Sequence, residues 1–210
     1  MNEPQTPWIN HLPSIEECRR IFRSIAMLDA ILIPEWEYRY YSFNSVWAEG
    51  EEMASMRDGE GSHYFALFTR DGLMIKGYDA EQAASGLMLS KAQSIDPLPA
   101  AVADFLQEPA FMGEQTTFCL WYLYSENRWL SDRPYTEQEC SLLQALWSGA
   151  SYYREWAADY TETEVHPEAV HRIFAGEPLT SALIAQLNPE LEFGDLEEDI
   201  EEIDYPATAD

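Results

Sequence analysis

One histidine in the sequence could act as a general base. His63 follows an acidic segment, residues 58–60, and opens an apolar run. A histidine held by a carboxylate can take a proton from water or from a substrate hydroxyl near neutral pH. Asp58 or Asp79 would orient it, which suggests a small-molecule hydrolase or transferase. The other interpretation is a histidine in the core or at a strand end, hydrogen-bonded to a neighbour.

The polar stretch around this histidine is where we expect a binding site. It combines an aromatic side chain with carboxylates and a guanidinium beside the predicted central sheet, a mixture that can fix the orientation of a ligand. Acidic pairs are abundant in this chain, so their presence assigns no catalytic residue. The predicted binding residues are Trp47, Glu51, Glu52, Arg57, Asp58, Glu60 and His63.

Metal and cofactor chemistry finds no support in the sequence. His166 and His171 are five residues apart, which places them about 140° from each other on a helix, too far round to share one metal. Cys18, Cys119 and Cys140 are far apart and form no C-x-x-C pair, so we expect reduced, packed thiols. The nucleophile-elbow, P-loop, dinucleotide-binding, kinase and EF-hand patterns are absent. We therefore predict no metal and no cofactor.

The net charge is the most unusual bulk property of the chain. With 38 acidic against 12 basic residues, it carries a formal charge of −26 at pH 7. This charge excludes a general grip on nucleic acid through phosphates and disfavours anionic membrane surfaces. It favours long-range attraction to a basic protein, and colloidal stability is the alternative explanation.

Length and hydropathy set further bounds. The 210 residues, 46% of them hydrophobic, suffice for one domain with a real core. No apolar stretch reaches the roughly 18 residues of a membrane span, and the N-terminal residues lack the basic and apolar regions of a signal peptide. We expect a cytoplasmic protein with no membrane partner.

The predicted elements are organised around a hairpin between Ser62 and Asp79. Asp71 and Gly72 predict a type I′ turn, because glycine accepts a positive φ without steric cost. The run from Tyr64 to Thr69 is apolar on both faces, which indicates a strand in the middle of a sheet. The strand after the turn alternates with Lys76 and is expected nearer an edge.

Further strands are predicted on both sides of this hairpin. The aromatic run at residues 36–43 and the run QTTFCLWYLY at residues 115–124 have strand composition. Residues 44–61 permit two interpretations, a short strand at Met53 to Arg57 or a helix interrupted at Gly50. We favour the strand, because the glycines that follow it suit a hairpin loop.

Helices are predicted before and after the strands. Ser14 and Glu17 form a capping box that opens an amphipathic helix ending before Pro34. A crossover helix is predicted from Ala80, another from Pro99 to Gln107, and four more fill residues 136–187. These elements predict an α+β fold, a mostly antiparallel sheet of four to five strands covered by helices, with a helical C-terminal half.

Three segments are expected: an N-terminal arm at residues 1–13, a single α+β domain at 14–189 and an acidic tail at 190–210. The tail holds ten acids and no base. Leu196, Ile200 and Ile203 form a narrow apolar stripe on it. Either the tail is frayed and the stripe docks weakly on its own domain, or the tail is a helix that docks into a partner's groove.

The segments YYSFNSVWAEGEEMASMRDGEG and TTFCLWYLY resemble those of a family of uncharacterised soluble bacterial proteins with no established function. The resemblance therefore implies no activity and no site residues.

The charge and the aromatic content lead to a functional hypothesis. The chain has 7 Trp, 12 Tyr and 9 Phe, which core packing explains unless some of these rings are exposed. The hypothesis is a non-enzymatic acidic binding module, similar to immunity or antitoxin proteins, that covers a basic protein partner. The alternatives are the His63 enzyme and a homo-oligomeric structural protein.

Overall fold

Six strands pair in chain order to form one antiparallel sheet in a computed structural model that describes residues 7–86, 98–112 and 115–208. Every strand therefore lies beside the strand that follows it in the sequence. The strands are β1 (Tyr41–Ala48), β2 (Glu51–Arg57), β3 (His63–Thr69), β4 (Gly72–Tyr78), β5 (Phe118–Leu123) and β6 (Arg128–Ser131).

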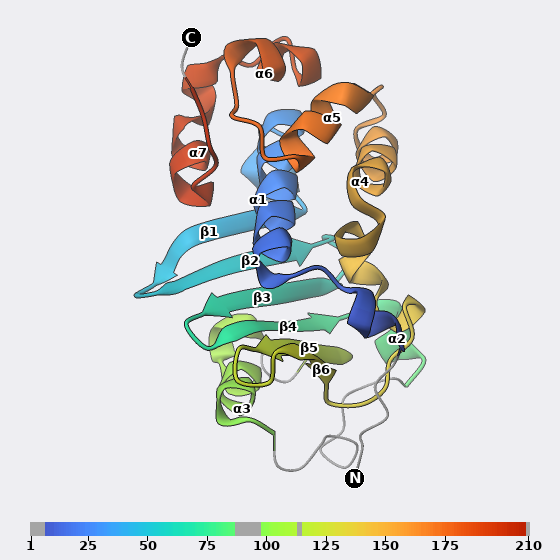
Figure 1. Cartoon of the computed structure of the whole chain (residues 1–210). Helices are drawn as coiled ribbons and strands as arrows, with labels where there is room; N and C mark the ends of the chain where they lie inside the picture. The colour runs from blue at the N-terminus through green and yellow to red at the C-terminus, as the bar shows by residue number, and fades with distance from the viewer. Residues whose placement is uncertain (1–6, 87–97, 113–114, 209–210) are drawn as a thin grey trace.

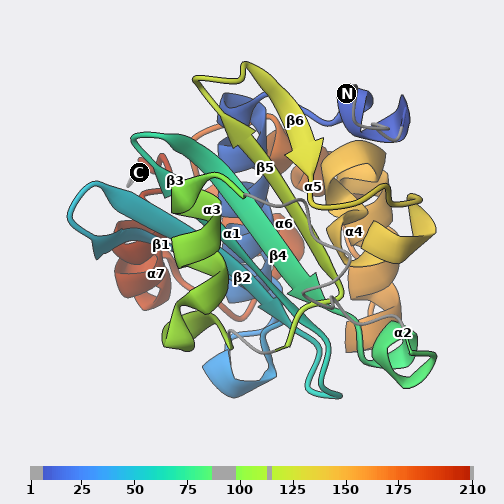
Figure 2. The same cartoon turned by 90° about the horizontal axis from the view of Figure 1, so that it is seen from below.

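Helices occupy both faces of this sheet in unequal number. The α-helices are α1 (Ile15–Leu32), α2 (Ala80–Ala84), α3 (Ala100–Gln107), α4 (Ala145–Thr161), α5 (Pro167–Phe174), α6 (Ser181–Leu187) and α7 (Glu197–Ile203). The 3-10 helices are η1 (Pro7–His11), η2 (Trp36–Tyr38), η3 (Pro109–Phe111), η4 (Gln138–Leu143) and η5 (Phe193–Leu196). Figure 1 shows α1 and α4 to α7 on one side of the sheet, and Figure 2 shows α3 against the other side.

The predicted α+β class and the helical C-terminal region are confirmed, with a sheet larger than predicted. The additional strand is β6, whose four residues are too few to show an alternating pattern. It is recognisable by its pairing, in which Trp121 lies opposite Leu130. The helices from Ser14 and from Pro99 are also confirmed.

The central strand β3 is buried on both faces, as its composition predicts. Tyr64, Ala66 and Phe68 join the large core beneath α1, whereas Phe65 and Leu67 join a smaller core beneath α3. The sheet is thus the middle layer of three, because each face of this strand removes apolar side chains from water.

Two details of the predicted hairpin are wrong. The strand β4 lies between β3 and β5, not near an edge, and Lys76 is 1% exposed because α3 covers it. The turn is formed by Arg70 and Asp71, and Gly72 is already the first residue of β4. Gly72 is needed for another reason: a Cβ there would lie 2.0 Å from the carbonyl oxygen of Tyr122 in β5.

The ambiguous segment at residues 44–61 is a β-hairpin, which confirms the strand interpretation. The strand β2 begins at Glu51, two residues before the predicted start, and pairs with both β1 and β3. The preceding aromatic run is only partly a strand, since residues Trp36–Tyr38 form η2 and β1 begins at Tyr41.

The helix α1 crosses the sheet and is tied to its neighbours through Asp29. The capping box predicted at its start is present, with Ser14 and Glu17 bonded to each other's backbone N–H groups. Near its end, Oδ2 of Asp29 accepts hydrogen bonds from the N–H groups of Tyr40 and Tyr41, at 2.9 and 2.8 Å. One buried carboxylate thus joins α1 to the start of β1.

The acidic C-terminal segment packs on the domain. Arg39, just before β1, pairs with Asp199, and Arg23 of α1 pairs with Asp204. Asn44 of β1 donates from Nδ2 to Glu202. Beyond α7, Ala207 forms a bridge with Leu179. The apolar stripe therefore lies against its own chain, and α7 is an ordered helix of the domain.

Two further predicted segments are described only in part. Trp8 anchors the N-terminal arm by donating from Nε1 to the carbonyl oxygen of Tyr135, at 2.6 Å. The crossover helix predicted from Ala80 is α2, which ends at Ala84 with Ser85 as its C-cap, and the rest of that prediction falls on residues outside the described ranges. Over the described ranges, no helix combines the length and apolarity that crossing a membrane requires.

Candidate functional site

The predicted binding residues do not form one site. Glu51 and Glu52 begin β2, whereas Arg57 ends it, and six residue steps along a strand span about 20 Å. Glu51 and Glu52, the first group, lie at the tip of the β1–β2 hairpin. Arg57, Asp58 and Glu60, the second group, lie at the loop between β2 and β3. The sequence places these residues close together in the chain, but the extended backbone separates them.

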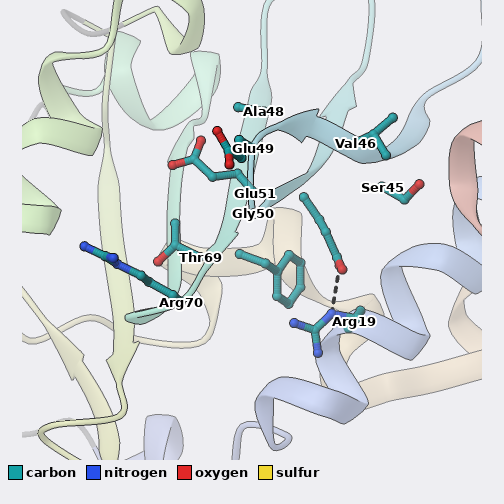
Figure 3. A pocket seen from close by; sticks show the side chains of 11 residues that line it. Arg19, Ser45, Val46, Ala48, Glu49, Gly50, Glu51, Thr69 and Arg70 are labelled. Carbon is teal, nitrogen blue, oxygen red and sulfur yellow. Dashed lines mark hydrogen bonds and ion pairs between the residues drawn. The ribbon is translucent and has the colours of Figure 1, made fainter.

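The first group lines an open groove between the hairpin tip and α1, with a volume of about 660 Å³. Within it, Nε of Arg19 donates to Oε2 of Glu52 at 2.8 Å, the contact dashed in Figure 3. Glu52 also pairs with Arg23 at 3.5 Å, so its charge is compensated. The groove is lined by Arg19, Ser45, Val46, Ala48, Glu49, Gly50, Glu51, Glu52, Phe68, Thr69 and Arg70.

Trp47 is not part of that groove. Its ring lies 5.7 Å from the ring of Phe111, next to η3. Successive side chains of a strand point to opposite faces, so Val46 lines the groove and Trp47 turns toward the α3 side. Trp47 is nevertheless 39% exposed.

The second group organises the loop between β2 and β3. Oδ1 of Asp58 accepts hydrogen bonds from the N–H groups of Glu60 and Ser62, at 2.8 and 2.9 Å. This bonding pattern fixes the loop and occupies one oxygen of the carboxylate. Arg57 and Glu60 remain exposed at the surface.

His63 does not form the predicted dyad with Asp58 or Asp79. The ring is 5% exposed, stacks on Tyr78 and shares a 3.1 Å hydrogen bond between Nδ1 and the carbonyl oxygen of Gly61. Burial lowers the pKa of His63, which favours the neutral ring. Asp79 instead caps α2 by accepting from the N–H of Gln82. This arrangement matches the alternative of a strand-end histidine bonded to a neighbour.

The predicted docking stripe of the tail is used within the chain. Leu196 and Ile203 are 1% and 4% exposed in the main core, and Ile200 packs partly buried against it. The α7 segment contacts α1 and β1. An apolar stripe covered in this way is not available to a partner.

A surface that the sequence analysis did not single out lies where η2 meets α4. Trp36 and Tyr38 are 64% and 57% exposed, and Tyr160 donates from its hydroxyl to the carbonyl oxygen of Tyr38 at 2.9 Å. We call the following residues the aromatic patch: Trp36, Tyr38, Tyr40, Trp156 and Tyr160.

Three rings of the aromatic patch, those of Tyr40, Trp156 and Tyr160, form a connected cluster. Trp156 and Tyr160 stack with their planes 9° apart and their centroids 5.4 Å apart. Tyr40 lies 4.9 and 4.7 Å from these two rings. The sequence signal was the density of aromatic residues after Pro34 and in the segment 152–160, but sequence cannot distinguish an exposed cluster from core.

Carboxylates border the aromatic patch. Burial raises the pKa of Tyr40, and the nearby carboxylates of Asp58 and Glu60 add to that rise. Glu35, Glu37 and Asp159, which adjoin patch residues in the chain, are exposed. Two of the residues predicted for binding, Asp58 and Glu60, thus lie beside this surface.

A buried lysine is the other unusual polar group. The Nζ atom of Lys76 has no hydrogen-bond partner among the described residues and lies 5.8 Å from the centre of the Phe105 ring. Burial lowers the pKa of Lys76 to about 8. Within the described ranges, no group of three or more histidine, cysteine and acidic side chains is placed to hold a metal ion.

Comparisons with protein-family models, with curated proteins and with solved structures gave no match. The resemblance to uncharacterised bacterial proteins stays a prediction.

Proposed function

We propose that this chain is a non-enzymatic acidic binding protein that covers the basic surface of a protein partner, in the manner of immunity or antitoxin proteins. The single observation that carries the proposal is the distribution of charge. The chain holds 38 acids and 12 bases, so most carboxylates have no basic counterpart within it.

The bases are largely neutralised inside the chain. Lys76 is buried, and six arginines of the described residues pair with carboxylates. These arginines are Arg19, Arg23, Arg39, Arg133, Arg154 and Arg172. Arg20, Arg57, Arg70 and Arg128 are exposed without an ion pair among the described residues, but the excess of acids over bases keeps the exterior strongly negative.

Such a surface supports binding to a cationic protein for two reasons. Its field attracts a basic partner over a distance of about 10 Å at moderate salt, which raises the association rate. It also repels other acidic proteins, so the field selects partners by charge. The buried position of His63 and the engagement of Asp58 and Asp79 elsewhere favour binding over acid-base chemistry.

Affinity capture tests the proposal. The full chain is immobilised and incubated with nuclease-treated native lysate at about 0.1 M and about 1 M salt, between which the Debye length falls from about 10 to about 3 Å. We expect basic proteins to be enriched at low salt and released at high salt. An eluate with no enrichment of basic proteins at either salt would contradict the proposal.

A further inference from the structure

We infer that the aromatic patch is the docking surface for the partner, and that it takes arginine side chains from a basic segment. This inference rests on the proposed function and deepens it by naming the surface and the recognised group.

Packing within the fold does not account for the exposed rings of the aromatic patch. Trp36 and Tyr38 leave more than half of their side-chain surface in water, although most other aromatic rings of this chain are buried in its two cores. Large exposed aromatic groups that adjoin one another are characteristic of protein interfaces, where they supply much of the binding energy.

Three rings of the patch, those of Tyr40, Trp156 and Tyr160, are held in place before any partner arrives. Tyr40 is fixed by the backbone, because its N–H donates to Asp29 and its carbonyl oxygen accepts from the N–H of Arg57 at 2.9 Å. Trp156 and Tyr160 lie one turn apart on the same helix and stack on each other. Rings that are already ordered lose little conformational entropy on binding.

The chemistry of the patch fits a guanidinium group. A cation is attracted to the face of an aromatic ring, and the flat guanidinium of arginine can stack there while its N–H groups remain free. The exposed carboxylates of Glu35, Glu37 and Asp159 stand next to these rings in the chain and can accept those N–H groups. Lysine carries the same charge but cannot stack or donate in a fork.

Charge complementarity therefore identifies the occupant as an arginine-bearing segment of a basic protein. The groove at the hairpin tip fits such a segment less well, because Arg19 and Arg70 line it beside its glutamates and its one aromatic residue, Phe68, is buried. Figure 3 shows both arginines at its edge.

Binding of two defined peptides tests the inference. The probes are an all-arginine and an all-lysine peptide of equal length, titrated by calorimetry against the full chain at constant ionic strength. We expect the arginine peptide to bind roughly three- to tenfold more tightly. The variant W36A, whose ring has no hydrogen bond among the described contacts, and the double variant W36A/Y38A should lose this preference.

Matched controls separate the surface from general charge. Tyr124 is 50% exposed at the β5–β6 turn, so Y124A removes an exposed ring elsewhere. The pair E35Q/E37Q removes two charges beside the patch, and E81Q/E126Q removes two charges from α2 and from the β5–β6 turn. Circular dichroism and thermal melting confirm that each variant is folded.

The outcomes distinguish this inference from the proposed function. The inference would be overturned if both peptides bound with equal affinity, if both glutamine pairs weakened that binding alike and if W36A/Y38A left it unchanged. These results would still support the acidic binding function. No binding of either peptide, together with no basic protein in the capture experiment, would overturn both.

Discussion

The hydroxyl of Tyr153 in α4 donates a 2.6 Å hydrogen bond to Oδ1 of Asp29 in α1, a carboxyl with no solvent exposure. The other oxygen, Oδ2, accepts from the backbone at the start of β1. One carboxyl therefore links two helices of the covering layer to the edge of the sheet. Because it lies away from water, its protonation is coupled to the stability of the fold.

Asp29 should make stability depend on pH. Burial raises its pKa to about 7 against partial compensation by the hydrogen bonds. The folded state then binds a proton that the unfolded state has released, so the free energy of unfolding decreases as pH rises from about 4 to about 7, by up to about 4 kcal/mol. Urea unfolding at several pH values measures this decrease.

The variant D29N tests whether Asp29 causes this decrease in the free energy of unfolding. Asparagine keeps an acceptor for the backbone N–H groups but carries no titratable proton, so the slope between pH 4 and 7 should be shallower than in the parent chain. Parallel pH profiles of the two proteins would show that Asp29 is not the group responsible.

Replacing Lys76 by methionine should stabilise the chain. Methionine fills a similar volume beneath α3 without leaving an unpaired ammonium in an apolar site, so we expect a gain of about 1–3 kcal/mol at pH 7. The pKa of Lys76 is lowered to about 8, so its cost is complete below pH 8 and disappears as pH rises toward the ordinary lysine value. The gain should therefore shrink at alkaline pH, and a K76M variant that is less stable at pH 7 would contradict this expectation.

Replacing Gly72 by alanine should be severely destabilising. The added Cβ would lie 2.0 Å from the carbonyl oxygen of Tyr122, and the φ of 149° disfavours any side chain. We expect a loss of more than about 3 kcal/mol, because β4 and β5 must move apart. The control is Gly59→Ala, where φ is also positive but no atom lies within 4 Å, and which should cost about 1 kcal/mol. Thermal melts of both variants measure the difference, and equal losses would show that the contact with Tyr122 is unimportant.

The variant I203A should show that α7 belongs to the domain. Removing this buried side chain should cost about 2–4 kcal/mol, whereas I200A, at a half-buried position, should cost less. Denaturant unfolding monitored by tryptophan fluorescence measures both changes. A negligible effect of I203A would mean that α7 is detached in solution.

Local sequence signals predicted the elements that are formed by interactions between residues near one another in the chain. The box of Ser14 and Glu17 opens α1 because both side chains bond to N–H groups within one turn. The apolar run from Tyr64 to Thr69 predicted a central strand because both of its faces need cover. Such signals depend only on residues close together in the chain.

The remaining errors arise from contacts between distant residues. Lys76 made β4 resemble an edge strand, because the sequence does not show that α3 covers it. Leu196 and Ile203 left the tail with two interpretations, because their partners in α1 and β1 lie more than a hundred residues away. The aromatic patch was not recognised as a site for the same reason, since exposure depends on the assembled fold.

The order of the strands has a consequence for how the chain reaches this fold. Neighbouring strands are also consecutive in sequence, so the β1 to β4 and β5 to β6 pairings close short loops at little entropic cost. The bond from Ser24 to Ile173 instead joins residues 149 apart, and that from Arg23 to Asp204 joins residues 181 apart. Hairpins should therefore gain protection from hydrogen exchange early in refolding, and the C-terminal helices should acquire it last.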